Sequence, residues 1–277
     1  TLVGGKSVRV LPVSLGRFKP LALTAAALSL VLVILPIGAI ILTSFINVIC
    51  QPLEAGNFTL NHYSYILSFK MAQEAFCNSF FMGAAAATLA LVLASLIAYY
   101  RVKARNRLAE ISDLIATVPY ATPGTVQALA LIIVFSGKYG LNLYNTMHII
   151  VLAYIIKYLA FAVRTISASL EQIDLSLEEA AQISGASWLQ SFRDIILPLV
   201  RPGLIAAWFL VFMACFYEFT MTILLYGPQS HNLGVVLYEL QTYSNQQAAS
   251  VLSVLILIVV LGGNLLVARL TRGKIGI

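Results

Sequence analysis

The chain has 277 residues, of which 60% are hydrophobic and only 10% are charged, and its net charge is +6. An average soluble domain has about 25% charged residues, so this composition excludes an ordinary soluble protein. The basic residues stand in short clusters at the ends of apolar runs, and no basic groove with interleaved aromatic residues is present, which argues against nucleic-acid binding. We therefore predict an all-α, polytopic protein embedded in a lipid bilayer.

The first twenty residues, TLVGGKSVRVLPVSLGRFKP, are polar, basic and rich in glycine and proline. This composition is typical of a linker, and it does not follow the pattern of a signal peptide. We expect residues 1–20 to be a cytoplasmic linker and residues 21–277 to form a transmembrane domain. Because the chain begins at Thr1, we also expect it to be a piece of a longer polypeptide.

Apolar runs long enough to cross a membrane follow the linker. A helix needs about 20 residues to cross the roughly 30 Å hydrocarbon core. The third run contains Pro119, Pro123 and Gly124, which predict a break; such breaks are tolerated where neighbouring helices or water satisfy the freed backbone groups. The six predicted spans are approximately 21–46, 76–100, 111–136, 144–168, 203–226 and 248–269.

The loops between these spans differ strongly in Lys and Arg content. Fourteen of the 17 basic residues fall on one side, which the positive-inside rule makes the cytoplasmic side. Lys70 and Lys138 fall on the other side, and Lys157 lies within the fourth span. Both termini and the 170–200 segment are therefore predicted to be cytoplasmic. The fourteen are Lys6, Arg9, Arg17, Lys19, Arg101, Lys103, Arg105, Arg107, Arg164, Arg193, Arg201, Arg269, Arg272 and Lys274.

The outer side consists of the segments 47–75, 137–143 and 227–247, of which the first is aromatic and is expected to lie flat on the interface. Cys50 and Cys77 lie at the two ends of that first segment. They could form a disulfide in an oxidising periplasm, or remain as two free, buried thiols. Cys215, in span five, is assigned to packing. No CxxC is present, and His62, His148 and His231 are scattered, so no metal site is predicted.

The cytoplasmic segment 174–200 carries the signals of a helix, a tight turn and a second helix. Ser176 and Glu179 have the spacing of a capping box, with Asp174 as the competing N-cap. Gly185 can supply the left-handed residue that ends the first helix. Ser187 and Gln190 repeat the capping-box spacing and would start the second helix.

This hairpin has features of a docking element. Ala180, Ala181 and Gly185 form a small face that another backbone can approach, and Glu178 and Glu179 offer carboxylates to a basic partner. The alternative is an amphipathic connector lying on lipid headgroups. A surface-lying helix is normally rich in Lys and Arg, whereas the first half of this one is acidic, which favours a protein partner.

The same stretch resembles a known family. The pattern Glu179-Ala180-Ala181, three residues, Gly185, nine residues, Ile195, one residue, Leu197-Pro198 is similar to the EAA loop of ABC importer permeases. NSFFMGAAAATLALVLASLIAYY, PYATPGTVQALAL and LLYGPQSHNLGVVLYEL also resemble these permeases. The similarity is greatest to the C-terminal half of fused ferric-iron permeases, in which a linker like residues 1–20 precedes the second half.

The resemblance implies a type I importer in the bacterial inner membrane. The hairpin would be the coupling helix that docks on a cytoplasmic ABC ATPase dimer, where Glu179 would pair with a basic residue and Gly185 would permit the turn. Other implied partners are a second permease half, fused or separate, and a periplasmic substrate-binding protein. The cargo would be ferric iron or, in related permeases, a polyamine, thiamine, a phosphonate, sulfate or a sugar.

The resemblance also implies that this chain is not itself an enzyme. ATP-Mg would be used by the partner ATPase, and the chain would bind no cofactor. The sequence contains no GxxxxGK[ST] phosphate loop.

Two ionisable residues, Lys157 and Glu218, lie inside predicted spans, where insertion costs at least about 2.5–3.5 kcal/mol. In one interpretation Glu218 faces the translocation path. In the other, Glu218 and Lys157 pair across helices or cap broken backbone. Lys157 could also anchor the hinge between its span and the hairpin. The break from Pro119 to Gly124 either lines a gate or packs against spans four and five.

Two other classes of function are compatible with a polytopic chain. An ion-coupled secondary transporter would need a midplane ion site, typically at inverted repeats, and no internal repeat is visible. A membrane scaffold would leave the EAA spacing without a reason. We therefore expect a permease.

Overall fold

A computed structural model describes residues 16–103 and 107–272, and this part of the chain is helical apart from loops and two isolated β-bridges. The all-α prediction is confirmed. Short 3₁₀ turns occur at Gly16–Phe18 and Ala55–Asn57, and π turns at Phe192–Ile196 and Leu240–Ser244. The helices are α1 (Lys19–Phe45), α2 (Asn61–Ser68), α3 (Lys70–Val102), α4 (Arg107–Ala121), α5 (Gly124–Phe135), α6 (Met147–Glu171), α7 (Leu175–Ile183), α8 (Trp188–Ser191), α9 (Leu197–Phe216), α10 (Thr222–Leu225), α11 (Leu233–Glu239) and α12 (Gln246–Arg272).

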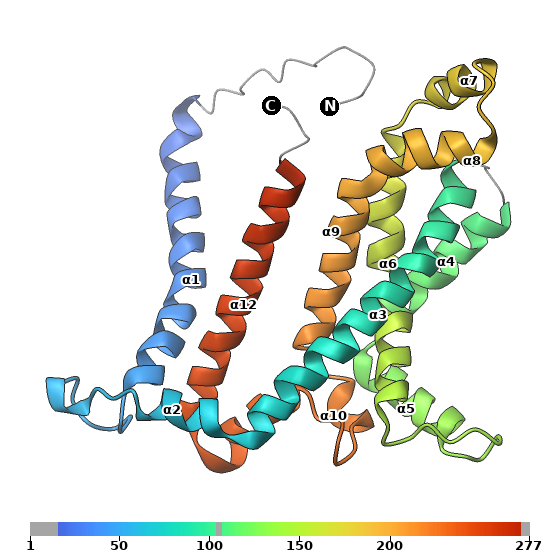
Figure 1. Ribbon diagram of the computed structural model, residues 1–277. Coiled ribbons are helices and arrows are strands. Elements are labelled where there is room, and N and C mark those ends of the chain that lie inside the picture. The colour runs from blue at the N-terminus through green and yellow to red at the C-terminus, as the bar shows by residue number, and fades with distance from the viewer. Residues whose placement is uncertain (1–15, 104–106, 273–277) are drawn as a thin grey trace.

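The long helices provide five to six candidate membrane spans. Five described helices are long and apolar enough to span a bilayer, and α4 and α5 together form a pair bent by 107°, which is either a broken sixth span or a re-entrant loop. The ends of α1 and α12 that are nearest the chain termini lie at the same end of the molecule as α7 (Figure 1). The predicted break in the third span is thus confirmed, and the predicted six spans are reached when the bent pair α4–α5 is counted as one span. Of the predicted linker, residues 1–15 lie outside the described residues, and Lys19 and Pro20 already belong to α1.

The fifth span differs most from its predicted bounds of 203–226. It extends from Trp188 to Phe216, because the second arm of the hairpin continues directly into the membrane. A π turn makes this possible: the amide of Leu197 donates to the carbonyl of Phe192, five residues earlier, immediately before Pro198. Pro198, which has no backbone N–H to donate, follows directly in the first turn of α9.

Helices α3, α6 and α9 form the centre of the bundle. The face of α3 that packs on the other two is made almost entirely of small residues, which let helix backbones approach closely within a membrane. Gly83 lies close to α9, since a Cβ placed there would be 3.3 Å from the ring of Phe212. The buried alanines of α3 are Ala72, Ala75, Ala86, Ala87, Ala90, Ala94 and Ala98.

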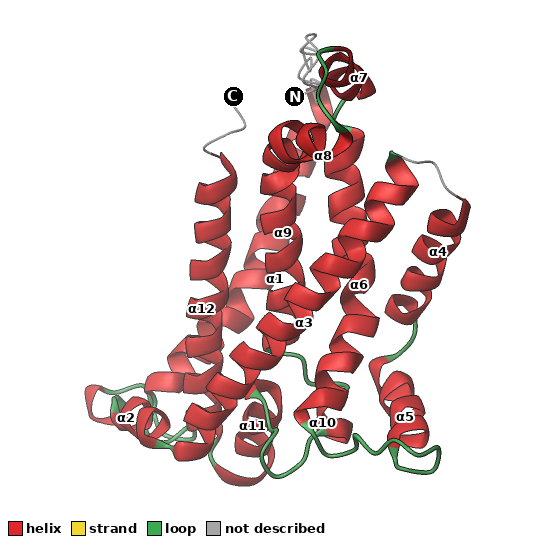
Figure 2. Cartoon of the chain, turned by 45° about the vertical axis from the view of Figure 1, so that its right-hand side comes forward, coloured by secondary structure: helices red, strands yellow, loops and turns green. Residues whose placement is uncertain are grey.

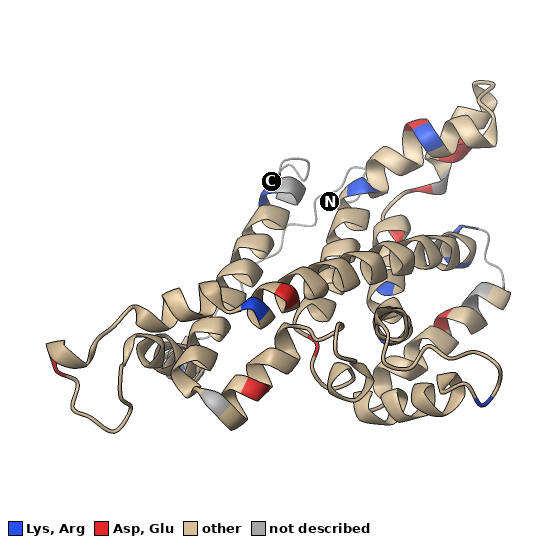
Figure 3. Ribbon diagram, turned by 60° about the horizontal axis from the view of Figure 1, so that its bottom comes forward, with Lys and Arg blue, Asp and Glu red and all other residues tan. Residues whose placement is uncertain are grey.

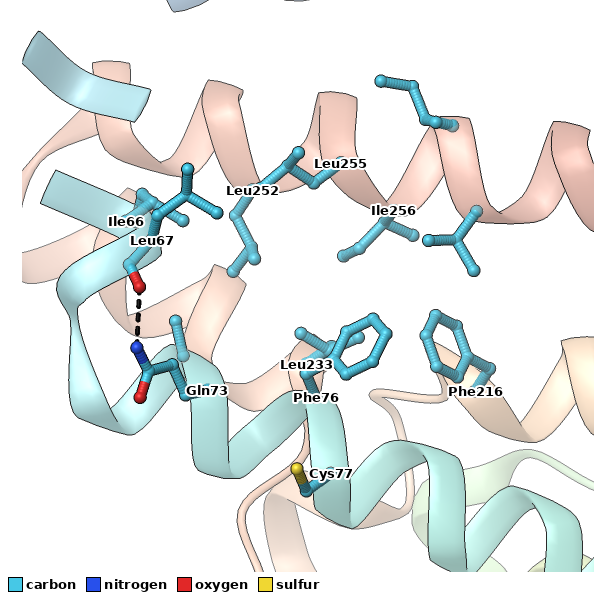
Figure 4. Close-up of a pocket in the computed structure, with 13 residues that line it drawn as sticks. Ile66, Leu67, Gln73, Phe76, Cys77, Phe216, Leu233, Leu252, Leu255 and Ile256 are labelled. Atoms are coloured by element: carbon cyan, nitrogen blue, oxygen red, sulfur yellow. Dashed lines mark hydrogen bonds between the residues drawn. The ribbon is translucent and has the colours of Figure 1, made fainter. Parts of the chain in front are cut away.

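Helices α1 and α12 pair with each other beside this bundle (Figure 1). Nearly the whole of α1 is exposed, and Ser44 is its only buried residue. An apolar cavity of about 400 Å³ lies between α12 and the corner formed by α2 and α3, with Phe76, Phe216 and Leu252 among its lining residues (Figure 4). The apolar surfaces of α1 and α12 are therefore available to lipid or to another membrane helix.

In the segment 47–75, which is predicted to lie on the outer side, the buried side chain of Asn57 bonds to the backbone. Asn57 accepts a hydrogen bond from the amide of Val48 and donates one to its carbonyl, at 2.9 and 3.0 Å. Cys50 and Cys77 are both free, so the disulfide is not formed. Both are also exposed, so the prediction of two free, buried thiols was right that they are free and wrong that they are buried. Cys215 is buried, as expected for a packing residue.

Charged residues are sparse along the long helices and are found mainly at helix ends and in the α7–α8 hairpin (Figure 3). The predicted outer segment 227–247 is more than a loop, because it contains α11, whose residues Leu233, Gly234, Val235 and Val236 are all buried. Its apolar LGVV run packs into the bundle.

Candidate functional site

The first arm of the hairpin, α7, is capped by Asp174. Its Oδ1 accepts a hydrogen bond from the backbone amide of Ser176 at 2.9 Å. Asp174, the competing N-cap, is therefore the correct one, and the capping box of Ser176 with Glu179 is not formed. The hydrogen bonds from the backbone and side chain of Ser176 favour the ionised carboxylate and lower the pKa of Asp174 below its ordinary value of 3.8, with Lys103 adding a smaller effect.

Replacing Asp174 with alanine is expected to fray the start of α7. The amides of Ser176 and Leu177 should then exchange with solvent several-fold faster in a hydrogen-exchange experiment. Because folding lowers the pKa, the contribution of the cap is complete above pH 3.8 and is lost as the pH falls through the folded value, so wild type and variant should converge in acid. Asp194→Ala, at a carboxylate that caps no helix, is the control; equal exchange in both variants would contradict the capping role.

The turn between the two arms is a Schellman motif. Gly185 has a φ of +88°. Its amide donates a hydrogen bond to the carbonyl of Gln182, and the amide of Ala186 donates one to the carbonyl of Ala181, both at 3.0 Å. This left-handed conformation is available to glycine without steric cost. The predicted role of Gly185 in ending the first arm is confirmed.

The second arm begins with the predicted capping box. The amide of Ser187 donates to Oε1 of Gln190 at 2.8 Å, and the amide of Gln190 donates to Oγ of Ser187 at 3.4 Å. Farther along the same helical run, Ile195 is half-buried, whereas Leu197 and Pro198 are exposed. These three residues of the EAA pattern therefore lie where the hairpin enters the membrane span.

The tip of the hairpin is exposed. Glu179 and Ala180 are exposed on α7, Ala181 is half-buried, and the side chain of Ile183 is 87% exposed. An isoleucine so fully exposed on a projecting turn, beside a carboxylate and a glycine, forms a small surface with both apolar and acidic character. Such a surface suits contact with another protein, because it combines an apolar anchor with a charge that gives orientation.

Glu178 points back into the molecule. Its Oε1 lies 2.7 Å from Nζ of Lys103, at the end of α3, and Lys103 also donates to the carbonyl of Ile173 at 3.0 Å. The two side chains are 13% and 4% exposed. Of the two carboxylates predicted to face a partner, Glu179 is thus the exposed one. Sequence reasoning used Lys103 only as a topology signal and did not identify it as the partner of Glu178.

A second polar site lies where α9 ends, deep in the bundle. The carboxylate of Glu218 accepts hydrogen bonds from the amides of Met221 and Thr222 at 3.1–3.2 Å, and so caps α10. Nζ of Lys157, on α6, lies 3.4 Å from Oε1 of Glu218. Glu218 and Lys157 therefore pair across helices, and Glu218 also caps broken backbone, as one of the two interpretations predicted.

Three residues that sequence reasoning missed complete this network. Asn232 caps α11 by accepting from the amide of Val235 at 3.0 Å, and it donates to Oη of Tyr154 at 3.0 Å and to the backbone carbonyl of Glu218. The hydroxyls of Tyr154 and Thr222 lie 2.6 Å apart. The only available signal was Asn232 itself, an N-cap residue directly before an apolar run.

The break between α4 and α5 lies close to this network at Gly124. Figure 2 shows the loop that joins the two helices at the break. A Cβ at Gly124 would lie 2.6 Å from Oγ1 of Thr220 and 2.7 Å from Nζ of Lys157. Pro123 is the N-cap of α5, and Nε2 of Gln127 satisfies the carbonyl of Pro119. Of the predicted path residues, the structure thus brings Gly124 next to Lys157, which pairs with Glu218. Pro119 and Pro123 lie in the same break as Gly124.

Comparison with known proteins identifies relatives of this chain. Residues 86–273 match the family described as "Binding-protein-dependent transport system inner membrane component". The chain is 34% identical over 189 residues to the Fe(3+)-transport system permease protein FbpB 2 of Haemophilus influenzae, covering 68% of this chain but 37% of that protein. It is 32% identical over 218 residues to the sulfate transport system permease protein CysT of Salmonella typhimurium, covering 73% and 76%.

Other relatives and solved structures agree. A putative 2-aminoethylphosphonate transport permease, PhnV of Salmonella paratyphi A, is 27% identical over 253 residues, covering 90% of this chain and 91% of that protein. A bacterial ABC transporter for the import of alginate has the same fold, with a TM-score of 0.72 at 17% identity over 94% of this chain and 96% of that one. The MetNI methionine ABC transporter matches with a TM-score of 0.61 at 18% identity, over 78% of this chain and 99% of that one.

The family match covers the hairpin, the network and the bent span, and so agrees with the resemblance seen in the EAA pattern. The chain belongs to the family of inner-membrane components of binding-protein-dependent transport systems.

Proposed function

We propose that this chain is a permease component of an ATP-driven importer for ferric iron, and that its α7–α8 hairpin couples it to a cytoplasmic ATPase. The observation that carries this proposal is the exposed hairpin tip, where Glu179, Ala180 and Gly185 of the EAA pattern are exposed beside Ile183. A tip held on a capped helix and a rigid turn can transmit force, because it does not rearrange when it is pushed.

The importer requires partners that supply energy and cargo. An ATPase dimer would hydrolyse ATP-Mg, and a second permease half, fused or separate, would complete the path. A periplasmic binding protein would deliver the cargo. The exposed apolar length of α1 supports an additional membrane partner, and the basic helix ends beside the hairpin support a cytoplasmic position for this end and for both termini.

The path through this half would pass the two helix breaks. Lys157 and Glu218 neutralise each other there, and the freed backbone groups at Pro119 and at Met221 are satisfied by side chains. A polar site that is already internally satisfied would bind cargo weakly, as a conduit requires. Ferric ion is the cargo supported by the Haemophilus relative; sulfate and 2-aminoethylphosphonate are the alternatives supported by the others.

The proposal is tested on the assembled transporter in proteoliposomes. Periplasmic binding protein loaded with ferric ion should stimulate ATP hydrolysis several-fold over the empty binding protein. Binding proteins loaded with sulfate or with 2-aminoethylphosphonate are the matched comparisons. Stimulation by one of these alone would remove iron and retain the permease assignment, whereas failure of any ATPase subunit to copurify with the chain would contradict the permease assignment itself.

A further inference from the structure

Helix α3 contacts both arms of the hairpin at its inner end. Lys103, the residue that ends the helix, forms the buried ion pair with Glu178 on α7. One turn earlier, Oη of Tyr99 accepts a hydrogen bond from Nε1 of Trp188 on α8 at 2.8 Å. The ring of Tyr99 also meets the rings of Trp188 and Phe192 edge-on, with centroids 6.0 and 5.8 Å apart. The two arms are thus held to one helix by independent contacts.

The outer end of the same helix holds the segment 229–233. Nδ2 of Asn78 donates to the carbonyls of Gln229 and His231 at 3.1 and 2.9 Å, and Oγ of Ser79 accepts from the amide of Leu233 at 2.9 Å. Within this segment, Asn232 is the residue that donates to the backbone carbonyl of Glu218. The outer end of α3 is therefore connected by hydrogen bonds to the buried network.

Nothing interrupts the helix between these two ends. It runs for 33 residues without a proline, and its small-residue face lies in close contact with α6 and α9. A continuous, closely packed helix moves as one element, because bending it would break backbone hydrogen bonds that a membrane cannot replace.

We propose that α3 is the element through which the hairpin and the outer segment 229–233 are coupled, with Lys103, Tyr99, Asn78 and Ser79 as its positioning residues. When the ATPase displaces the hairpin, α3 moves with it and shifts the outer segment together with the Asn232 cap. The inference rests on the proposed function, since it needs an ATPase to move the hairpin. It does not depend on which cargo is carried.

The native residue Cys77 reports on the outer end of α3. It is exposed, it lines a surface pocket with Pro228 and Gln229, and Cys215 is buried. In the assembled transporter carrying Cys50→Ser, the labelling rate of Cys77 with a membrane-impermeant maleimide is measured with and without ATP plus vanadate. We expect the two rates to differ by about fivefold or more, the lower range of ordinary allosteric coupling.

Variants at the inner end then test the connection. Lys103→Met should abolish the effect of ATP and vanadate on Cys77, while Lys103→Arg and the charge exchange Lys103→Glu with Glu178→Lys should restore it. A side chain needed only for folding would lower the amount of assembled transporter but leave the ratio of the two labelling rates unchanged in the transporter that does assemble. Lys70→Met, on the same helix at an exposed position, is the matched control and should retain the full effect.

Asn78→Ala tests the outer end, and the ratio of the two labelling rates cancels any direct change in the reactivity of the neighbouring Cys77. If both ends act along one path, the double variant Lys103→Met/Asn78→Ala should be no worse than either single variant. Three outcomes would each overturn the proposal. The first is that both single variants bind the ATPase and keep the full effect of ATP and vanadate on the labelling of Cys77. The second is that the losses of this effect add strictly in the double variant, and the third is that the charge exchange fails to restore it. Failure of the ATPase to bind the unmodified chain would instead refute the proposed function.

Discussion

Replacing Glu218 with leucine is expected to destabilise the protein by about 3–5 kcal/mol, the usual cost of removing one partner of a buried ion pair. The substitution would leave the ammonium of Lys157 and the amides of Met221 and Thr222 without their acceptor deep in the bundle. The loss is measured as a fall in melting temperature and in the yield of folded protein in detergent.

Glu218→Gln is the matched control, because its amide oxygen can still accept from the two backbone amides. Its loss should be clearly smaller than that of Glu218→Leu. The loss of stability in Lys157→Met should lie between those of Glu218→Gln and Glu218→Leu. The double variant Lys157→Met/Glu218→Gln should be more stable than Lys157→Met alone, since no uncompensated charge remains. A Glu218→Leu protein that melts like wild type would show that the network contributes little to the fold.

The same variants separate the structural role of Glu218 from its predicted role in the translocation path. A Glu218→Gln protein that assembles and melts normally, but no longer takes up cargo, would support a charge requirement in the path. Normal uptake by this variant would remove that role and leave Glu218 as a pairing and capping residue.

Glu179→Lys is expected to lower ATPase-coupled uptake at least about tenfold, which corresponds to 1.4 kcal/mol of lost docking free energy. The exposed carboxylate becomes an ammonium facing a basic partner, so attraction turns into repulsion. Copurification of the ATPase and uptake in proteoliposomes are the measurements. Glu171→Lys, at another exposed carboxylate near the end of α6, is the control and should leave both unchanged.

Gly185→Ala tests the turn of the hairpin with a matched partner elsewhere. A Cβ at Gly185 meets no atom within 4 Å, so its cost comes only from the backbone at φ of +88°, about 1–2 kcal/mol. Gly140, in the connection between α5 and α6, has φ of +91° and equally open surroundings. Gly140→Ala should therefore match Gly185→Ala in backbone strain but leave ATPase coupling intact. Equal losses of coupling in the two variants would contradict a specific role for the hairpin turn.

The amino-acid sequence by itself determined the features that depend on short-range chemistry. Span length follows from the thickness of the bilayer, and the Pro119–Gly124 break follows from residues that disfavour a continuous helix. The Ser187 capping box and the left-handed Gly185 likewise satisfy backbone groups only a few residues away. The EAA spacing indicated the family for the same reason, since all of its positions lie within one hairpin.

The tertiary structure alone decided which polar groups meet. Lys157 and Glu218 are 61 residues apart, and Tyr154 and Asn232 are 78 residues apart, so no local pattern selects these pairs. The end of α9 at Phe216, the burial of α11 and the engagement of Glu178 by Lys103 all depend on such contacts. In an apolar bundle each buried charge or amide must find a partner wherever the packing of helices places one, and that placement is a property of the assembled fold.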